Sequence, residues 1–299
     1  MRVSERQRYA VATNRMESAK RRNTNAMSIL STQKRLQKVE DDPVGMTRVI
    51  KGRHNIRKIE TFIENINFSK GFINLSETAL QGVQNNLQRA REIAVAMGND
   101  TYALDSKAAV AREVKEIVSE VINLGNTQYN GHFVFSGFRS RTPSFSHDGT
   151  FLGDDGAIYM EVADGNFRQI NLQGRSVFEA TLEDQEKGHF NMIDALKMLQ
   201  DSLTSDDKQG VYKAIDELQY QLEKTASLQA KIGAIWGAVE NAEQRLELQK
   251  EQKTEVISKI EDADMFKATS DFKRTESALQ TTLMASNKLL QPSLLNFLQ

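Results

Sequence analysis

The chain has 299 residues, of which 26% are charged and 7% aromatic, and its formal net charge is −1. This length allows about two domains, and the composition is that of a folded protein rather than a disordered one. Cysteine is absent, which excludes a disulfide framework, a thiolate nucleophile and a cysteine-based metal site. No apolar run is long enough to cross a bilayer, and we expect no cleaved signal peptide because the first residues lack an apolar core.

Residues 1–40 predict a helix with few apolar side chains, which is marginal without a partner. The helix is expected to end at Asp41-Asp42-Pro43, because proline disfavours helix in the residue before it and often begins the next helix. Both aspartates can cap that next helix. Residues 1–60 carry 15 Lys and Arg against 6 Asp and Glu, a local charge of +9.

Two apolar runs with heptad spacing follow. The first consists of Ile59, Ile66, Ile73, Leu80, Leu87 and Ala94, with Phe62, Ile63, Val83 and Ala90 beside them. The second consists of Val110, Val114, Ile117, Val121 and Leu124. This spacing predicts two helices with matching apolar seams, which end near Gly98 and Gly125.

The region between Gly131 and Gly188 has a different texture, with eight of the 17 glycines of the chain. Asp-Gly dipeptides predict tight turns at 148–149, 155–156 and 164–165. Short apolar or alternating runs predict strands at 133–135, 158–162, 167–172 and 177–178. We therefore expect a small antiparallel β insert, joined to the helices by a packed turn at Phe135-Ser136-Gly137.

Helical periodicity resumes at 193–203, turns at 205–207 and continues in one long helix from Val211 to Ala263. A helix of that length would run about 80 Å, which is too long for a globular core and predicts a rod. Its seam becomes polar at Gln249, Lys250, Gln252 and Lys253. Our hypothesis is that this polar gap marks the boundary between a folded rod and a terminal region that becomes ordered only on assembly.

A last helix is expected from Met265, and the chain closes on an apolar segment after Pro292. An apolar end must be covered, either by the N-terminal helix or by another subunit. Together the patterns predict a mainly α fold with a small β insert. The expected architecture is an elongated antiparallel helical rod built from both chain ends, with a terminal coiled-coil region and a central antiparallel β domain. The expected parts are terminal paired helices at 1–44 and 265–299, a helical rod domain at 45–132 and 189–264, and a β-rich inserted domain at 133–188.

Several stretches resemble the flagellin superfamily. LSTQKRLQKVEDDPVG at 30–45 is similar to its N-terminal signature, KIGAIWGAVENAEQRLELQKEQKTEVISKIEDAD at 231–264 to its C-terminal rod helix, and ASNKLLQPSLLNFL at 285–298 to its closing segment. NTQYNGHFVFSGFRSRTP at 126–143 and the segment 149–178 are similar to the hook-associated protein 3 group within it. The sequence departs from the family at Gln33, where flagellins often have glycine, and at the extra-basic Lys20-Arg21-Arg22.

The resemblance implies a structural adaptor subunit that joins the hook of the bacterial flagellum to its filament, and no enzyme, cofactor or metal. The implied partners are copies of itself in a ring, a first hook-associated junction protein on the hook side, flagellin on the filament side and a cytosolic chaperone before export. It also implies export through the flagellar type III apparatus to the extracellular flagellum. The residues expected at the assembly interface are Leu30, Leu36, Asp41, Asp42, Pro43, Leu279, Leu283, Leu290, Leu294, Leu295 and Phe297.

The same residues allow three other interpretations. The basic N-terminal end can suggest a coiled-coil nucleic-acid binder, but no aromatic residues are interleaved with its cations beyond Tyr9. Asp41-Asp42 and Asp154-Asp155 are more simply turn caps than catalytic pairs, and the four histidines show no ligand spacing. Within the family, a flagellin-type filament subunit is the alternative to the junction adaptor.

Overall fold

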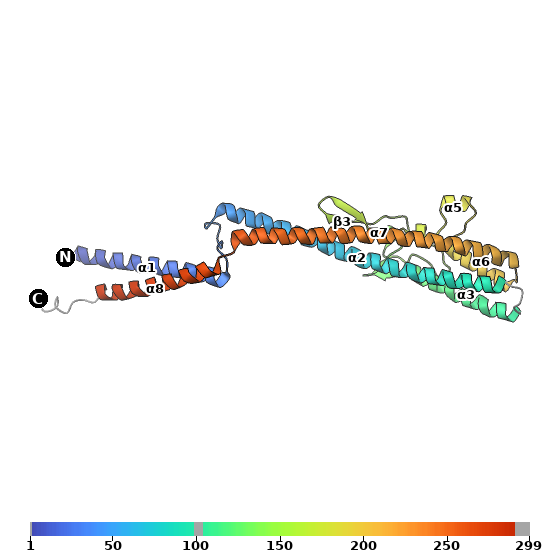
Figure 1. The fold of residues 1–299 in the computed structure, drawn as a ribbon, viewed down its shortest axis with the longest axis horizontal. Helices are drawn as coiled ribbons and strands as arrows, with labels where there is room; N and C mark the ends of the chain where they lie inside the picture. The colour runs from blue at the N-terminus through green and yellow to red at the C-terminus, as the bar shows by residue number, and fades with distance from the viewer. Residues whose placement is uncertain (1, 99–103, 291–299) are drawn as a thin grey trace. The chain divides into compact units, whose positions relative to one another are not determined.

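The computed structural model describes residues 2–98 and 104–290, and it is mainly helical (Figure 1). The long helices are α1 (Arg2–Thr32), α2 (Pro43–Gly98), α3 (Leu104–Gly125), α6 (Met192–Thr204), α7 (Lys208–Glu261) and α8 (Met265–Leu290). The short elements are β1 (Gln128–Tyr129), β2 (His132–Phe133), the 3-10 helix η1 (Gly137–Arg139), β3 (Tyr159–Ala163), β4 (Asn166–Gln169), α4 (Gly174–Phe178) and α5 (Leu182–Glu186). The predicted mainly α fold with a small antiparallel β insert is confirmed.

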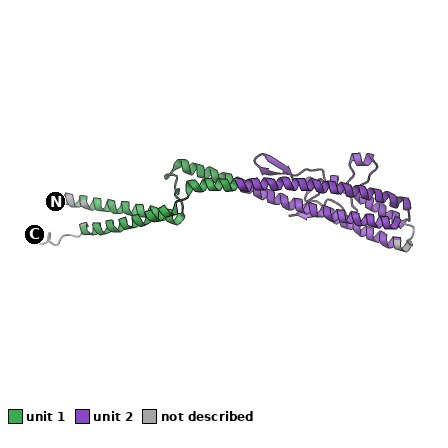
Figure 2. Cartoon of the chain, in the orientation of Figure 1, with its two compact units in different colours: residues 1–58, 249–299 green, residues 59–248 purple. Residues whose placement is uncertain are grey.

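The chain divides into two compact units (Figure 2). Unit 1 comprises residues 1–58 and 249–299, and therefore contains both chain ends, whereas unit 2 comprises residues 59–248. Helices α2 and α7 contribute to both units. On α7 the division falls between Leu248 and Gln249, where the predicted polar gap begins, and the helix runs through it without a break. The predicted three-part division of the chain stays a prediction.

Unit 2 is a bundle of α3, α6 and the adjoining parts of α2 and α7 around one aliphatic core. The predicted heptad positions on α2 are buried, and Leu80, Leu87 and Leu196 are fully enclosed. Polar contacts tie the helices together at their edges: Arg89 on α2 pairs with Glu113 on α3 at 2.7 Å, and Lys70 on α2 pairs with Glu243 on α7. Burial of regularly spaced large aliphatic side chains is the main source of stability in such a bundle.

Two short hairpins make up the β structure of unit 2. Strands β1 and β2 pair antiparallel about Asn130-Gly131, whose φ angles are both positive, as a type I′ turn requires. Strands β3 and β4 pair antiparallel about Asp164-Gly165, which confirms that predicted turn. The Asp148-Gly149 turn is also present, because the Asp148 carboxylate accepts hydrogen bonds from the hydroxyls of its neighbours and closes the loop.

The turn at Phe135-Ser136-Gly137 is packed, as predicted. The Ser136 hydroxyl is buried and donates to the main-chain oxygen of Thr142 at 2.8 Å, while Gly137 has a φ of +65°. The strand predicted at 177–178 is wrong, because these residues lie in α4. There Phe178 packs edge-on against Phe135 and Phe145, so burial in an aromatic cluster outweighs the β preference of the sequence.

Candidate assembly interface

Helices α1 and α8 of unit 1 pack against each other along a seam in which small side chains outnumber large apolar ones. The seam positions on α1 are Ala12, Met16, Ala19, Asn23, Ala26 and Leu30, and those on α8 are Ala268, Phe272, Thr275, Leu279, Thr282 and Ser286. All are buried or half-buried, and the steps alternate between fours and threes, as in a coiled coil. Alanine, threonine and serine bury little apolar area, so the pair is held far less strongly than unit 2.

The middle of this seam contains a polar contact. The Asn23 side-chain amide donates to the hydroxyl of Thr275 at 3.5 Å, across the two helices. A polar layer in a coiled-coil seam lowers stability but disfavours a shifted register, because a shift would leave the amide facing an apolar partner. The contact therefore favours one alignment of α1 with α8.

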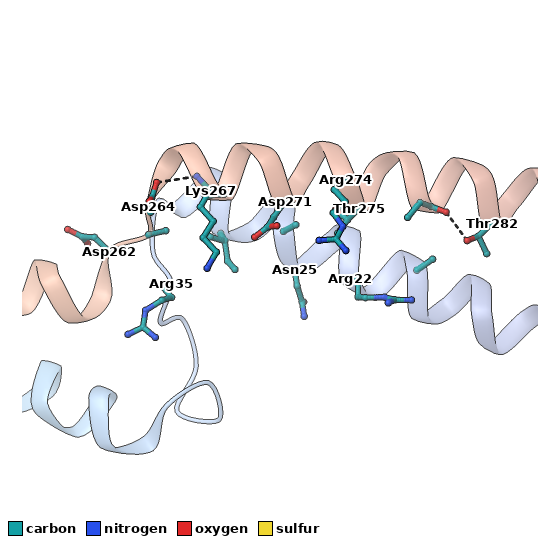
Figure 3. Close-up of a pocket in the computed structure, with 16 residues that line it drawn as sticks. Arg22, Asn25, Arg35, Asp262, Asp264, Lys267, Asp271, Arg274, Thr275 and Thr282 are labelled. Atoms are coloured by element: carbon teal, nitrogen blue, oxygen red, sulfur yellow. Dashed lines mark hydrogen bonds between the residues drawn. The ribbon is translucent and has the colours of Figure 1, made fainter.

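One face of the α1–α8 pair is hollowed into an open groove, part of which is shown in Figure 3. Alanines from both helices lie along it, among them Ala19, Ala26 and Ala278. Arg22 from α1 and Arg274 from α8 stand among the residues that line it. The groove is lined by charged side chains as well as alanines, Asp271 among them, so it offers both apolar and charged contacts to a neighbouring helix.

The opposite face of the pair carries exposed apolar side chains. Tyr9, Met27, Met265 and Leu283 are all more than one-third exposed. Each lies two residues from a position that lines the groove, namely Val11, Ile29, Lys267 and Ala285. Since two residues turn about 200° around a helix, the apolar side chains face away from the groove. The pair thus presents two different faces.

The connection between α1 and α2 is a compact turn that is pinned to the end of α7. Helix α1 ends at Thr32, earlier than the predicted end at residue 40, because Gln33 takes a left-handed conformation with a φ of +59°. Its main-chain oxygen accepts a hydrogen bond of 2.9 Å from the N–H of Ala263. Leu36 follows and is buried.

The two aspartates before Pro43 accept hydrogen bonds from different parts of the chain. The Asp42 carboxylate accepts from the N–H of Gly45 at 2.9 Å and caps α2, as predicted. The Asp41 carboxylate instead accepts from the N–H groups of Lys38 and Gln37, so the prediction that it also caps α2 is wrong. These hydrogen bonds hold the pKa of Asp41 below its ordinary value.

The structure brings some of the predicted interface residues together and separates others. Leu30 and Leu279 lie in the α1–α8 seam, and Leu283 is exposed on the apolar face. Leu36, Asp41, Asp42 and Pro43 lie in the connection that is pinned to α7 and at the start of α2. The side chain of Leu290 and the residues Leu294, Leu295 and Phe297 lie outside the described residues. That any of these contacts a neighbouring subunit stays a prediction.

Sequence reasoning missed the seam itself. It followed large apolar side chains, whereas the spacing that carries the signal on α1 is the seven-residue repeat of Ala12, Ala19 and Ala26. The role of Glu261, the last residue of α7, was also missed. Its buried carboxylate accepts from Lys34 at 2.7 Å and from Arg53 at 2.5 Å, and no local pattern predicts such a contact.

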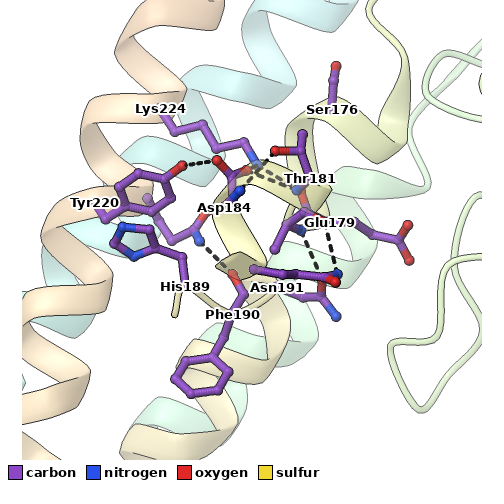
Figure 4. Close-up of polar contacts among 12 residues, drawn as sticks. Ser176, Glu179, Thr181, Asp184, His189, Phe190, Asn191, Tyr220 and Lys224 are labelled. Atoms are coloured by element: carbon purple, nitrogen blue, oxygen red, sulfur yellow. Dashed lines mark hydrogen bonds and ion pairs between the residues drawn. The ribbon is translucent and has the colours of Figure 1, made fainter. Parts of the chain in front are cut away.

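A second concentration of polar groups fastens the segment around α5 to α7 in unit 2 (Figure 4). Asp184 accepts a 2.5 Å hydrogen bond from the Tyr220 hydroxyl and pairs with Lys224 at 3.3 Å, while the His189 ring stacks on Tyr220. Burial alone would raise the pKa of Asp184, but Tyr220, the main chain of Thr181 and the charge of Lys224 together hold it well below its ordinary value. The cluster is closed by its own partners and serves as a structural fastening.

Within 2–98 and 104–290, no three His, Asp or Glu side chains come close enough to hold a metal ion. Across the same part of the chain, no helix combines the length and the apolar character needed to span a bilayer.

Comparison with known proteins agrees with this architecture. The family model of the bacterial flagellin N-terminal helical region matches residues 3–140, and that of the flagellin C-terminal helical region matches residues 213–298. Flagellar hook-associated protein 3 of Escherichia coli is 23% identical over 274 residues, which is 86% of each chain. Flagellin of Bacillus subtilis is 25% identical over 285 residues, which is 92% of each chain.

A solved structure has the same fold. The putative flagellar hook-associated protein of Vibrio parahaemolyticus superposes with a TM-score of 0.68 at 16% identity, and the match covers 74% of this chain and all of that one. The two flagellin family models match regions that start from opposite ends of the chain, and each region extends from unit 1 into unit 2. The resemblance to the flagellin superfamily and its hook-associated proteins is thereby confirmed. The chain belongs to the flagellin family, a family of structural components of the bacterial flagellum.

Proposed function

We propose that the chain is a structural adaptor that joins the flagellar hook to the filament and assembles as a ring through α1 and α8. The observation that carries the proposal is the weak, small-residue seam of this helix pair beside an open groove. A pair with so little buried apolar area gains stability when neighbouring copies cover it. The flagellar hook-associated protein among the relatives supports the place in the flagellum.

The two faces of the α1–α8 pair support the mode of assembly. The groove, which includes the exposed Val11, lies on one face, and the exposed side chains of Tyr9, Met27, Met265 and Leu283 lie on the other, so a copy that uses one face leaves the other free. Such a contact is heterologous, and heterologous contacts repeat into a ring or a helical array rather than stopping at a dimer. In the proposed assembly, a first hook-associated junction protein covers the hook side and flagellin covers the filament side.

The weak pairing of α1 with α8 also bears on export of the chain. We propose that the chain travels through the flagellar type III apparatus after release from a cytosolic chaperone, and that α1 and α8 become ordered only on assembly. A weak seam supports this order of events, because the ordering cost of about 1–2 kcal/mol per residue for the backbone is poorly offset in a single chain. Removal of Gln291–Gln299 is expected to leave a folded monomer that does not incorporate.

The test is electron microscopy of cells that lack this chain, with the culture medium probed for flagellin. Bare hooks together with flagellin shed into the medium are expected of a junction adaptor. Hooks that still carry filaments would contradict the proposal and favour the filament-subunit alternative, which the 25% identity to a flagellin also supports.

The purified chain is expected to show no salt-dependent DNA binding. A strong shift in DNA mobility that disappears with added salt would favour a nucleic-acid binder instead.

A further inference from the structure

The end of α7 gathers contacts from two other segments of unit 1, the α1–α2 connection and α2. Glu261 is the last residue of the helix, and its side chain is only 8% exposed. Its carboxylate oxygen Oε1 accepts from Lys34 Nζ in the α1–α2 connection and from the Arg53 guanidinium in α2. Its main-chain oxygen accepts from the N–H groups of Arg35 at 2.7 Å and Leu36 at 3.2 Å.

These contacts also complete the end of the helix. The last carbonyl groups of an α-helix have no partner within the helix, and at α7 the connection from α1 supplies them. The Arg35 guanidinium donates to the main-chain oxygen of Ile260 at 2.8 Å. On the far side, Ala263 N–H donates back to Gln33, so the α1–α2 and α7–α8 connections are hydrogen-bonded to each other.

A buried carboxylate with two cationic partners is sensitive to loss of its charge. The side chains of Lys34 and Arg53 are each almost half exposed, so water solvates either cation when its ion pair with Glu261 is lost. Replacing the carboxylate by an amide removes both ion pairs at once and leaves a buried amide oxygen as the only acceptor. The Glu261 charge therefore serves both cations at once, whereas the main-chain hydrogen bonds between the two connections do not involve its side chain.

We propose that Glu261 is a positioning residue: it fixes the direction in which α1 and α8 leave the adjoining ends of α2 and α7 within unit 1. The consequence for assembly rests on the proposed function. A groove that is held in one direction meets a neighbouring subunit in a single orientation. Loss of the Glu261 charge then weakens incorporation while the bundle of unit 2 stays folded.

The test compares Glu261→Gln with a matched control, Glu255→Gln, in the full chain. Glu255 lies on the same helix and pairs with Lys259 at 2.7 Å, but both of these side chains are exposed. Amide hydrogen exchange on the purified protein is read at Arg35, Leu36 and Ala263, and incorporation into flagella is read by complementation of the deleted strain. In Glu261→Gln we expect exchange at these amides to be about tenfold faster and incorporation to fall, with both unchanged in Glu255→Gln. Glu261→Asp, which keeps the charge, should recover part of both.

Each other outcome overturns the proposal. Unchanged exchange in Glu261→Gln, or wild-type exchange that is already as fast, means that the carboxylate does not hold the connections. Faster exchange with normal incorporation means that Glu261 only stabilises the local fold. Slowed incorporation with unchanged exchange means that the residue touches a neighbour directly. If the wild-type chain itself fails to incorporate at the hook, the proposed function fails, and the exchange measurement still decides the role of Glu261.

Discussion

Unit 2 and the α1–α8 pair of unit 1 share the same heptad spacing, but the seam side chains are large in unit 2 and mostly small in the pair. In unit 2 the seam positions are Ile, Leu and Val, such as Ile66, Leu80 and Leu87, and they are fully buried. In the α1–α8 pair the positions are mostly Ala, Thr and Ser, and most of them are only half-buried. Spacing decides that a helix pairs, but side-chain size decides whether the pair is stable alone. In the proposed assembly, a weak pair leaves α1 and α8 to gain their stability from neighbouring copies.

The largest expected effect compares the same change in the two seams. Leu196→Ala removes a fully buried side chain from unit 2 and should lower its free energy of unfolding by about 2–5 kcal/mol. Leu279→Ala, in the half-buried α1–α8 seam, should leave the unfolding of unit 2 unchanged. The single tryptophan, Trp236, lies in unit 2, so its fluorescence in urea titrations reports on that unit. If both variants lost the same free energy of unfolding, the contrast between the two seams would be contradicted.

A second comparison uses glycines in the helices of unit 2. A Cβ on Gly71 of α2 would overlap the Tyr129 ring, which packs edge-on against Phe68 and Phe72, so Gly71→Ala should destabilise by about 1–3 kcal/mol. Gly233 on α7 has open space around it. Gly233→Ala should stabilise by roughly 0.5–1 kcal/mol through helix propensity. Thermal unfolding followed by circular dichroism measures both, and a stabilising Gly71→Ala would show that Tyr129 moves aside freely.

The α5 fastening predicts a dependence on pH. The folded-state pKa of Asp184 is lowered, so its contribution is complete above the ordinary carboxyl pKa of about 3.9 and is lost as the pH falls through the folded value. Asp184→Asn should therefore cost roughly 1–3 kcal/mol at pH 7, and the cost should shrink in strongly acidic solution. Asp201→Asn, at an exposed position on α6, is the control. Urea titrations at several pH values give the comparison, and a cost independent of pH would exclude the ionised carboxylate as its source.

The smallest expected effect concerns the α1–α2 connection of unit 1. Gln33 has a left-handed backbone, which is unfavourable for side chains with a Cβ and is readily adopted by glycine. Gln33→Gly should stabilise the connection by about 1 kcal/mol at most, because glycine also gains freedom in the unfolded chain. Slower hydrogen exchange at the Ala263 amide, which bonds to residue 33, measures the gain. Faster exchange would mean that the glutamine side chain helps to hold the turn.

The sequence by itself determined most of the helical architecture. Heptad spacing predicted α2, α3 and α7, and Pro43 with Asp42 predicted the start of α2, because helix periodicity and proline act locally. The Asp164-Gly165 turn followed from its dipeptide in the same way. The Asn130-Gly131 hairpin carried an equally local signal that was overlooked. The family followed from motifs at both chain ends.

Only the tertiary structure decided which contacts close the fold. The short helix at Val177-Phe178 depends on aromatic contacts with Phe135 and Phe145, which lie far from it in the sequence, so its local β preference was overruled. The early end of α1 depends on Gln33 bonding to Ala263, and the role of Glu261 depends on cations from two other segments. A periodic pattern records which face of a helix is buried, but an ion pair between residues over 200 positions apart leaves no such pattern in the chain.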